Sequence, residues 1–257
     1  FYAQPKIHNP LPSRRTYSHS VAYAGTFYGE RYKERSQELG QLLDAVKPFG
    51  LTIYDRQLLN PNSPYRFPAQ LNRYVSGGLG YLEMVEAYKA HPVHINVNSV
   101  AGSPTMFSRR VVELAASGST IISGRGRGVD DVLAGLVYSV KSPAEATILA
   151  DRWMNDEKAR IHDAWLAYRL VHRGHTAAHR LAYVLRTAGL TVQAPQLSGY
   201  ALQTDVLTAA AVTTVNEQTV LPNVIVYNSV EGKVTLPAGT VSIARSNLTP
   251  DVLRDNG

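Results

Sequence analysis

Up to about residue 190, short apolar runs alternate with segments in which apolar residues recur at helical spacing. The runs at residues 20–25, 51–54, 94–98 and 120–123 predict strands, because each is short and closed by Gly or polar residues. Residues 30–46, 79–90, 106–117 and 128–136 predict helices between them, and residues 137–140 predict an edge strand. This alternation predicts an α/β fold with a doubly wound, parallel, Rossmann-like sheet.

The segments that flank this unit have a different character. Residues 1–18 contain Pro5, Pro10 and Pro12 and predict a linker or crossing segment outside the core. Residues 144–187 predict a helical extension with one break near Arg173, opened by Ser142 as N-cap and Pro143 at the first position. From residue 191 Val and Thr increase, and we expect a small appended α/β unit with a helix at 205–218 and a strand at 223–228.

Loops that follow two of the predicted strands are candidates for a ligand site. One contains Gly102, Ser103 and Pro104, and the other alternates Gly and Arg over residues 124–128. In a parallel sheet both loops lie at the carboxyl edge, where helix N-termini and free backbone N–H groups favour phosphates. The central unit therefore predicts a binding site for a phosphorylated ligand.

Composition and charge narrow the class of protein. The 257 residues carry a formal net charge of +6, spread along the chain without a basic block, which favours an anionic small ligand over nucleic acid, with membrane headgroups as a secondary partner. The absence of Cys excludes disulfides, thiolate catalysis and Cys-based zinc sites. The sequence has no long apolar run and no signal-peptide pattern, so we expect a cytoplasmic protein, with the inner membrane face as a peripheral location.

Five motifs in order carry a resemblance to a known family. They are QPKIHNP (4–10), VAYAGTFYGERYKER (21–35), LTIYDR (51–56), INVNS with TMFSRRVVELAASG (95–118) and HTAAHRL (175–181). Over residues 1–190 the chain resembles the group 1 glycosyltransferases, and in particular the CgeB-like spore-maturation branch. The resemblance implies the C-terminal, donor-binding lobe of a GT-B enzyme that uses a nucleotide-diphosphate sugar. It also implies no cofactor, no metal, an acceptor of unknown kind (glycan, lipid or protein), and an N-terminal acceptor lobe outside this chain.

The tail of the chain resembles a second domain. Residues 191–257 are similar to the helix-and-strand opening of a family 2 glycosyltransferase domain, but they lack an acidic DxD metal motif. The chain ends in the turn sequence Asp255-Asn256-Gly257, and we expect it to be a piece of a longer polypeptide. A degenerate second domain and an accidental likeness both stay open.

Glu113 is the strongest single candidate for donor binding. It matches the family glutamate that accepts hydrogen bonds from the ribose diol, and a carboxylate suits a fixed hydroxyl pair. The alternative is an i,i+4 ion pair with Arg109 on an exposed helix face. Phe107, Val111 and Leu114 form the apolar stripe, which places Glu113 near its flank.

The start of the same predicted helix is a second candidate. Thr105, Met106 and Phe107 would present unpaired N–H groups to an anion. Thr105 stands where the family carries an acidic residue, eight positions before the ribose glutamate, and its alternative use is as an N-cap.

Basic residues after the first strand are candidates for the diphosphate. The resemblance places them just after Gly25, where Arg forks would neutralise phosphate oxygens. We expect Arg31 to face the diphosphate and Arg35 to lie on the surface, paired with neighbouring glutamates.

The Gly-Arg loop and a histidine cluster complete the candidates. The glycines would let the backbone approach a ligand, and Asp130 and Asp131 either touch the sugar or cap the next helix. The histidines at 172, 175 and 179 share a helix face, but no carboxylate accompanies them, and we expect no metal. The predicted donor-binding residues are Gly25, Arg31, Ser103, Thr105, Met106, Phe107, Arg109, Glu113, Gly124, Gly126 and Gly128.

No catalytic base is evident, and three other functions stay open. The first is a Rossmann-type module for another nucleotide. The second is a scaffold without catalysis. The third is a basic surface for nucleic acid, whose binding would depend steeply on salt.

Overall fold

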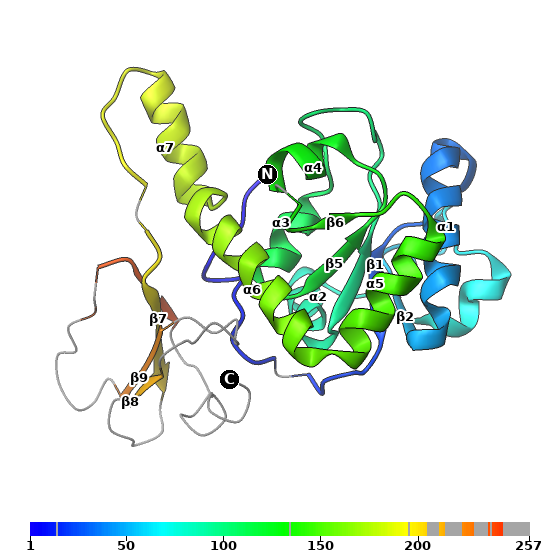
Figure 1. Ribbon diagram of the computed structural model, residues 1–257, viewed down its shortest axis with the longest axis horizontal. Helices are drawn as coiled ribbons and strands as arrows, with labels where there is room; N and C mark the ends of the chain where they lie inside the picture. The colour runs from blue at the N-terminus through cyan, green and yellow to red at the C-terminus, as the bar shows by residue number, and fades with distance from the viewer. Residues whose placement is uncertain are drawn as a thin grey trace.

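A six-stranded parallel sheet forms the centre of the molecule (Figure 1). The computed structural model describes residues 1–13, 15–133, 135–194, 196–204, 211–213, 223–228, 236 and 238–243. The strand order is β3-β2-β1-β4-β5-β6. The strands are β1 (Val21–Gly25), β2 (Leu51–Asp55), β3 (Val75–Gly77), β4 (Val93–Asn96), β5 (Thr120–Ser123) and β6 (Tyr138–Ser139). The predicted doubly wound α/β sheet is confirmed, and its order reverses between β1 and β4, where such folds bind ligands.

Helices cover both faces of this sheet. On one face, α1 (Lys33–Val46) and α5 (Pro143–Asn155) enclose a core that includes Leu39, Ile53 and Trp153. On the other face, α2 (Tyr81–Ala90), α3 (Arg109–Ala116), α4 (Arg127–Leu133) and α6 (Glu157–Gly174) enclose a second core. The 3-10 turns η1 (Gly29–Tyr32), η2 (Lys47–Phe49) and η3 (Ala69–Tyr74) complete the connections. Alternate residues of each strand point into the two cores, which fixes the sheet between the helix layers.

Several helix boundaries differ from the prediction, and two of the differences bear on the site and on the C-terminal helices. The third helix begins at Arg109 and not at residue 106, with Ser108 at the N-cap position. The long C-terminal helix has two breaks and not one, because the side chain of Asp156 accepts a hydrogen bond from the N–H of Ala159 and starts α6. The predicted break near Arg173 is confirmed, and Thr176 caps α7 (Ala177–Thr187) after it.

The N-terminal segment packs against the C-terminal helices. The N–H of Ala3 donates to the carbonyl of His175 at 2.8 Å, and the N–H of Ala177 donates to the carbonyl of Ala3 at 3.0 Å. Ala3 and Leu11 are buried. The prediction that residues 1–18 stay out of the core is wrong at these positions, because the chain fills the junction between α6 and α7.

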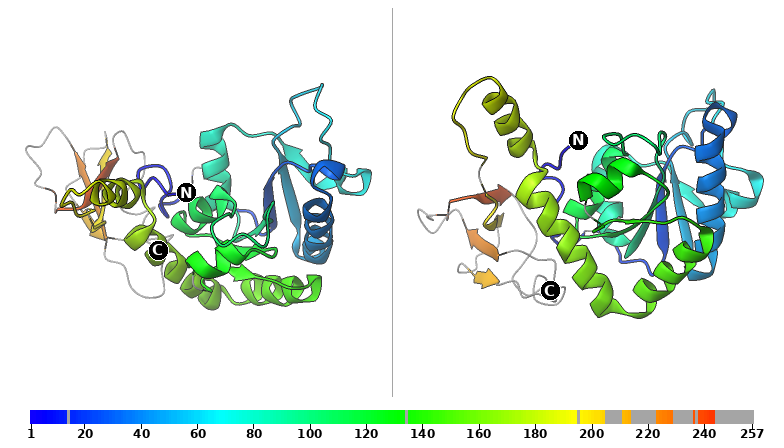
Figure 2. Two further views of the ribbon diagram at one scale, coloured as in Figure 1. Left: turned by 90° about the horizontal axis from the view of Figure 1, so that it is seen from above. Right: turned by 45° about the horizontal axis from the view of Figure 1, so that its top comes forward.

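The C-terminal part forms a second, smaller sheet beyond α6 and α7 (Figures 1 and 2). Its order is β10 (Thr240–Ile243), β7 (Gly199–Thr204), β9 (Asn223–Asn228) and β8 (Ala211–Thr213). The predicted strand at 223–228 is confirmed. The helix predicted at 205–218 is wrong at residues 211–213, which pair antiparallel with β9, and its other residues lie outside the described part. Among the described residues, no helix is long and apolar enough to cross a membrane.

Candidate functional site

The ends of β1, β4 and β5 bring three loops together at the carboxyl edge of the sheet. These loops follow Gly25, Asn96 and Ser123, and they are adjacent because β4 lies between β1 and β5. This edge includes the point at which the strand order reverses. The residues that line it decide which ligand the edge can accept.

A cationic cluster lies at the end of β1. A β-carbon built on Gly25 would stand 2.7 Å from Nη2 of Arg110, so the guanidinium lies directly against the glycine. The same guanidinium lies over the ring of Tyr23, 5.2 Å from its centroid. Burial lowers the pKa of Arg110, but its interactions with Tyr23 and Tyr88 leave that pKa above its ordinary value. The residues predicted from the sequence to bind the donor include Arg109 but not its neighbour Arg110.

Arg35 joins this cluster from α1. Its Nη1 donates to the carbonyl of Thr26 and its Nη2 to the hydroxyl of Tyr23, each at 3.2 Å. Only 9% of Arg35 is exposed, so the prediction of a surface position is wrong. Among the described residues, no carboxylate lies within 4.0 Å of the guanidinium of Arg35 or Arg110. Within the described part of the chain, the end of β1 therefore holds two guanidinium groups with no carboxylate at ion-pair distance.

Arg31 lies outside this cluster. It is exposed, and its Nη1 donates to the hydroxyl of Tyr65 at 2.6 Å, a bond that raises the pKa of Arg31. The 3-10 turn before α1 sets this difference, because it directs residue 31 to solvent while residue 35 faces the sheet. The sequence predicted Arg31 at the ligand and Arg35 on the surface, whereas the structure exposes Arg31 and buries Arg35 at the sheet edge.

Glu113 is buried within α3. Its side chain is 3% exposed, and Nε of Arg109 lies 2.8 Å from its Oε1. The i,i+4 ion pair is present, but the exposed face expected for it is wrong, because the carboxylate lies beneath Arg109. Burial raises the pKa of Glu113, while Arg109 and Arg110 oppose that rise.

Three further residues surround the same carboxylate. The hydroxyl of Tyr88 donates to Oε2 at 3.4 Å, and Nε2 of His8 lies 3.7 Å from Oε1. Nε2 of His8 also lies 2.9 Å from the hydroxyl of Tyr81. Sequence reasoning missed all three residues, although His8 lies within the QPKIHNP motif.

The loop after β4 does not present free N–H groups as predicted. Ser103 Oγ accepts hydrogen bonds from the N–H of Thr105 at 3.4 Å and from the N–H of Met106 at 3.1 Å. Phe107 is 4% exposed and packs in the core. The expectation of unpaired N–H groups is wrong at Thr105 and Met106, since Ser103 accepts from both and the helix begins only at Arg109.

The glycines of the loop after β5 make room for the protein's own groups. A β-carbon at Gly124 would stand 2.7 Å from the carboxylate of Glu38, and one at Gly128 would stand 2.9 Å from the carbonyl oxygen of Met106. A β-carbon at Gly126 would collide with the amide of Asn98. These contacts give a structural reason for each glycine, in place of the close approach to a ligand that the sequence suggested.

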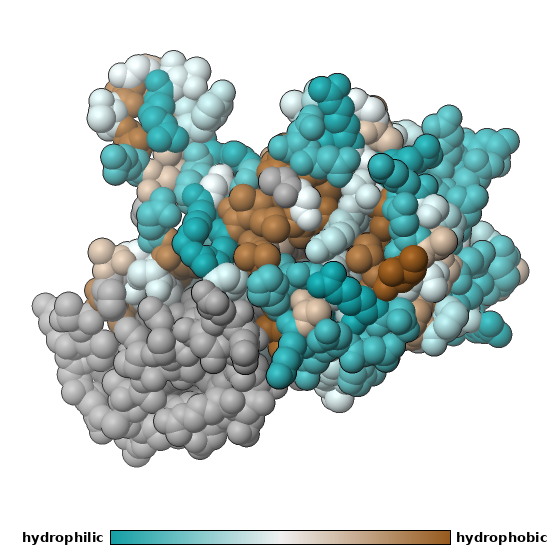
Figure 3. All heavy atoms as spheres, viewed as in Figure 1, coloured by the Kyte–Doolittle hydropathy of each residue, from teal (hydrophilic) through white to brown (hydrophobic). Residues whose placement is uncertain are grey.

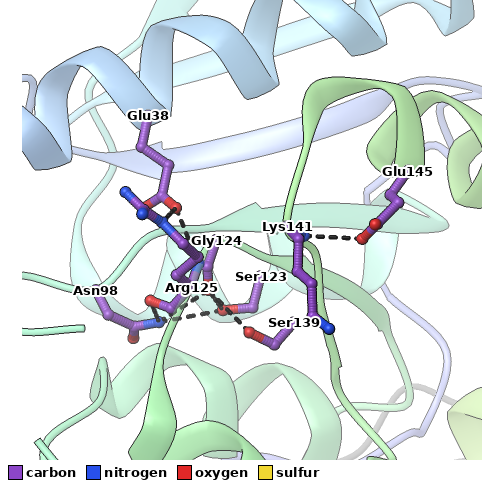
Figure 4. Close-up of polar contacts among 8 residues, drawn as sticks. All are labelled: Glu38, Asn98, Ser123, Gly124, Arg125, Ser139, Lys141 and Glu145. Atoms are coloured by element: carbon purple, nitrogen blue, oxygen red, sulfur yellow. Dashed lines mark hydrogen bonds and ion pairs between the residues drawn. The ribbon is translucent and has the colours of Figure 1, made fainter. Parts of the chain in front are cut away.

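Asn98 ties the two loops together (Figure 4). Its Nδ2 lies 3.2 Å from Oγ of Ser123, 3.3 Å from the carbonyl of Gly124 and 3.2 Å from the carbonyl of Arg125. Its Oδ1 accepts from the N–H of Ser108 at 3.1 Å. The sequence signal for this buried network is the pair of asparagines that alternate with apolar residues in INVNS.

Glu38 closes the loop after β5 from the side of α1. Its Oε1 accepts from the N–H of Arg125 at 2.9 Å and from Nε of the same residue at 3.2 Å (Figure 4). A hollow of about 340 Å³ adjoins this contact and is lined by polar residues that include Gln37, Gln41 and Lys141. A second hollow of about 420 Å³ lies between α4, β6 and α5, where apolar surface gathers on the face shown in Figure 3.

The remaining candidates have local partners. Asp131 lies within α4 and forms an i,i+4 ion pair with Arg127 at 3.2 Å, so it does not cap that helix. His172 Nε2 lies 3.3 Å from the carbonyl of Ala116, while Nδ1 of His179 lies 2.6 Å from the hydroxyl of Thr176. Among the described residues, no group of three metal-ligating side chains is arranged to hold a metal ion.

A family model described as glycosyl transferase-like matches residues 16–186. No curated protein matches the chain in sequence.

Three solved structures are among those similar to the chain. One is the C-terminal domain of a group 1 glycosyl transferase family protein (LpcC) from Francisella tularensis, which is 16% identical to this chain. The match covers 68% of this chain and 99% of that domain, with a TM-score of 0.47. Another is sucrose-phosphate synthase from Thermosynechococcus elongatus, at 15% identity and a TM-score of 0.49. The match covers 73% of this chain and 51% of the synthase, so it spans about half of that protein. AviGT4, a glycosyltransferase involved in avilamycin A biosynthesis, is 13% identical over 75% of this chain and 58% of its own, with a TM-score of 0.45.

Proposed function

Because the chain belongs to the glycosyl transferase-like family, we propose that it binds a nucleotide-diphosphate sugar and supports transfer of the sugar to an acceptor. The donor would lie at the carboxyl edge of the sheet, over the ends of β1 and β4. This proposal includes hexosyl transfer, no bound cofactor, a place in the CgeB-like branch and a cytoplasmic location.

The positive charge at the end of β1 is the observation that carries this proposal. Arg35 and Arg110 both adjoin Tyr23, and no carboxylate among the described residues pairs with either guanidinium. Unpaired charges that are withdrawn from water are costly, and an anionic ligand relieves that cost. A diphosphate would supply the negative charge that these two guanidinium groups lack as a partner. The transfer step requires stabilisation of the charge on the leaving diphosphate.

Glu113 is our candidate for the ribose of the donor. Its Oε1 is held by Arg109, while the bond from Tyr88 to Oε2 is long, at 3.4 Å. A carboxylate oxygen has capacity for a second hydrogen bond, so Oε2 could accept one from a ribose hydroxyl. Arg109 covers the carboxylate and is itself 58% exposed, and we expect this side chain to move when the donor binds.

Thermal stability in the presence of nucleotides tests the proposal. We expect UDP, GDP, ADP or TDP to stabilise the protein. A nucleotide present at 100 times its dissociation constant should raise the free energy of unfolding by about 2.7 kcal/mol. Arg110→Gln should weaken that stabilisation, while Arg31→Gln serves as the matched control because its side chain is exposed and lies outside the cluster. The same response to the nucleotide in both variants would remove Arg110 from the donor site.

A second candidate function is a scaffold that binds no donor. The burial of Glu113 and the filled spaces at Gly124 and Gly128 favour it, because both features complete the protein's own packing. The same experiment separates the two functions. If none of the four nucleotides stabilises the wild-type protein, the scaffold is favoured.

A further inference from the structure

His8 connects the N-terminal segment to the carboxylate of Glu113. The two side chains are 105 positions apart in the sequence, and each is 3% exposed. Nε2 of His8 lies 3.7 Å from Oε1 of Glu113 and 2.9 Å from the hydroxyl of Tyr81. The carboxylate is therefore bordered by residues 1–13, α2 and α3 together.

The backbone fixes the tautomer of His8. The N–H of Gln4 donates to Nδ1 at 3.0 Å, so Nδ1 accepts and the proton of the neutral ring resides on Nε2. That proton points to the hydroxyl of Tyr81, which interacts in turn with Glu113. Burial, followed by Arg109 and Lys89, lowers the pKa of His8 to about 4, and the contact with Glu113 is therefore a contact to a neutral ring.

Tyr81 connects the two sides of this arrangement. Its ring lies 6.2 Å from the ring of His8, perpendicular to it, and 5.8 Å from the guanidinium of Arg109. Arg109 holds Oε1 of Glu113 at 2.8 Å from the other side. Arg109 thus fixes Oε1 by an ion pair, and His8 reaches the carboxylate through the hydroxyl of Tyr81. Oε2 is oriented toward Tyr88.

We propose that His8, acting through Tyr81, is a positioning residue that orients the Glu113 carboxylate for the ribose of the donor. This inference rests on the proposed function, and it assigns the QPKIHNP segment a part in the donor site. The carboxylate is bound on several sides, so the loss of one neighbour lets it rotate and lose its alignment with a hydroxyl pair. The expected effect is a loss of discrimination between ribose and deoxyribose and not a loss of all nucleotide binding.

Binding of matched nucleotides tests this role. Dissociation constants are measured for UDP, GDP and ADP and for the 2′-deoxy form of each, with the wild-type chain and with His8→Leu, His8→Gln and Tyr81→Phe. We expect the wild-type chain to prefer the ribose form about tenfold or more, since a buried acceptor without its hydroxyl partner is costly. His8→Leu should bring that ratio close to one and change deoxynucleotide binding less than about twofold.

The glutamine variant separates positioning from packing. Its Nε2 can reach the position of the ring Nε2, so His8→Gln should restore most of the ribose preference. His19→Leu is the control, because His19 is an exposed histidine just after the N-terminal segment. Tyr81 is 42% exposed, and Tyr81→Phe removes one hydroxyl, so this variant decides the question if His8→Leu does not fold.

Each outcome bears on a different statement. Ribose preference that persists in both His8→Leu and Tyr81→Phe would overturn the positioning role and leave the proposed function standing. Equal binding of ribose and deoxyribose forms by the wild-type chain would also overturn it, while diphosphate binding stands. Failure of the wild-type chain to bind any of the nucleotides would overturn both.

Discussion

The guanidinium of Arg110 packs directly against Gly25 at the end of β1, since a β-carbon at Gly25 would stand 2.7 Å from Nη2 of Arg110. The same β-carbon would stand 2.7 Å from the hydroxyl of the fully buried Tyr23, whose ring cannot yield easily. The glycine therefore allows the guanidinium and the ring to share the edge of the sheet.

We expect Gly25→Ala to displace Arg110 and to weaken nucleotide binding, with a loss of about 1–3 kcal/mol in the free energy of unfolding from overpacking. Urea denaturation and nucleotide titration measure the two effects. Gly40→Ala is the control, because a β-carbon there meets nothing within 4 Å and the residue lies inside α1. That control should gain about 0.5–1 kcal/mol, and an equal gain in Gly25→Ala would contradict the fit described above.

Gly128 should tolerate a side chain less well than Gly124. Its β-carbon would meet the backbone of Met106 at 2.9 Å, whereas the one at Gly124 would meet the flexible end of Glu38. We expect Gly128→Ala to destabilise the fold by about 1–3 kcal/mol in spite of the gain in helix propensity. Gly102→Ala, which has open space, is the control in urea denaturation. Stabilisation of the protein by Gly128→Ala would show that the two loops are not in contact.

Removal of the Asn98 amide should loosen both loops. Asn98→Ala leaves the carbonyls of Gly124 and Arg125 and the N–H of Ser108 without this partner. An unsatisfied buried polar group costs about 1–3 kcal/mol. We therefore expect the free energy of unfolding, measured by chemical denaturation, to fall by at least that amount. Asn72→Ala, at an exposed position, should change stability by less than about 0.5 kcal/mol. Comparable stabilities for the two variants would refute the bridging role.

Stability should fall as the solution is acidified below about pH 6.5. Several histidines are buried, and burial, the largest cause in each case, lowers their pKa below the ordinary value of 6.5. The unfolded chain then binds more protons than the folded one, so stability is lost as pH falls from about 6.5 toward the folded pKa values. These values are about 4 for His8, His172 and His175 and about 3 for His94.

Urea denaturation at pH 8, 7, 6 and 5 measures this dependence. Glu113 acts in the opposite direction, because burial raises its pKa and its protonation in the folded state offsets part of the loss. His94→Gln should make the free energy of unfolding fall less steeply between pH 6.5 and 5. His19→Gln, at an exposed position, should leave that pH dependence unchanged. Constant stability from pH 8 to pH 5 would show that these rings are not held neutral.

Short-range patterns predicted the elements because they act within a few residues. Ser142 and Pro143 open α5 as expected, and Ser142 Oγ accepts from the N–H of Glu145 at 3.2 Å. The predicted start of α3 was wrong because Thr105 and Ser108 are both residues that can cap a helix, and only the tertiary structure decides between them. The three-residue strand β3 was missed because its pairing with β2 comes from the sheet and not from its own sequence.

The sequence by itself determined the α/β class, the parallel sheet and the family, because periodicity, caps and motif order are properties of neighbouring residues. Which side chains meet at the edge was decided only by the tertiary structure. It buried Arg35 and exposed Arg31, placed Arg110 against Gly25, and brought His8 to Glu113. The physical reason is that these contacts join segments far apart in the chain. Their geometry follows from how helices pack on a sheet, which no local propensity specifies.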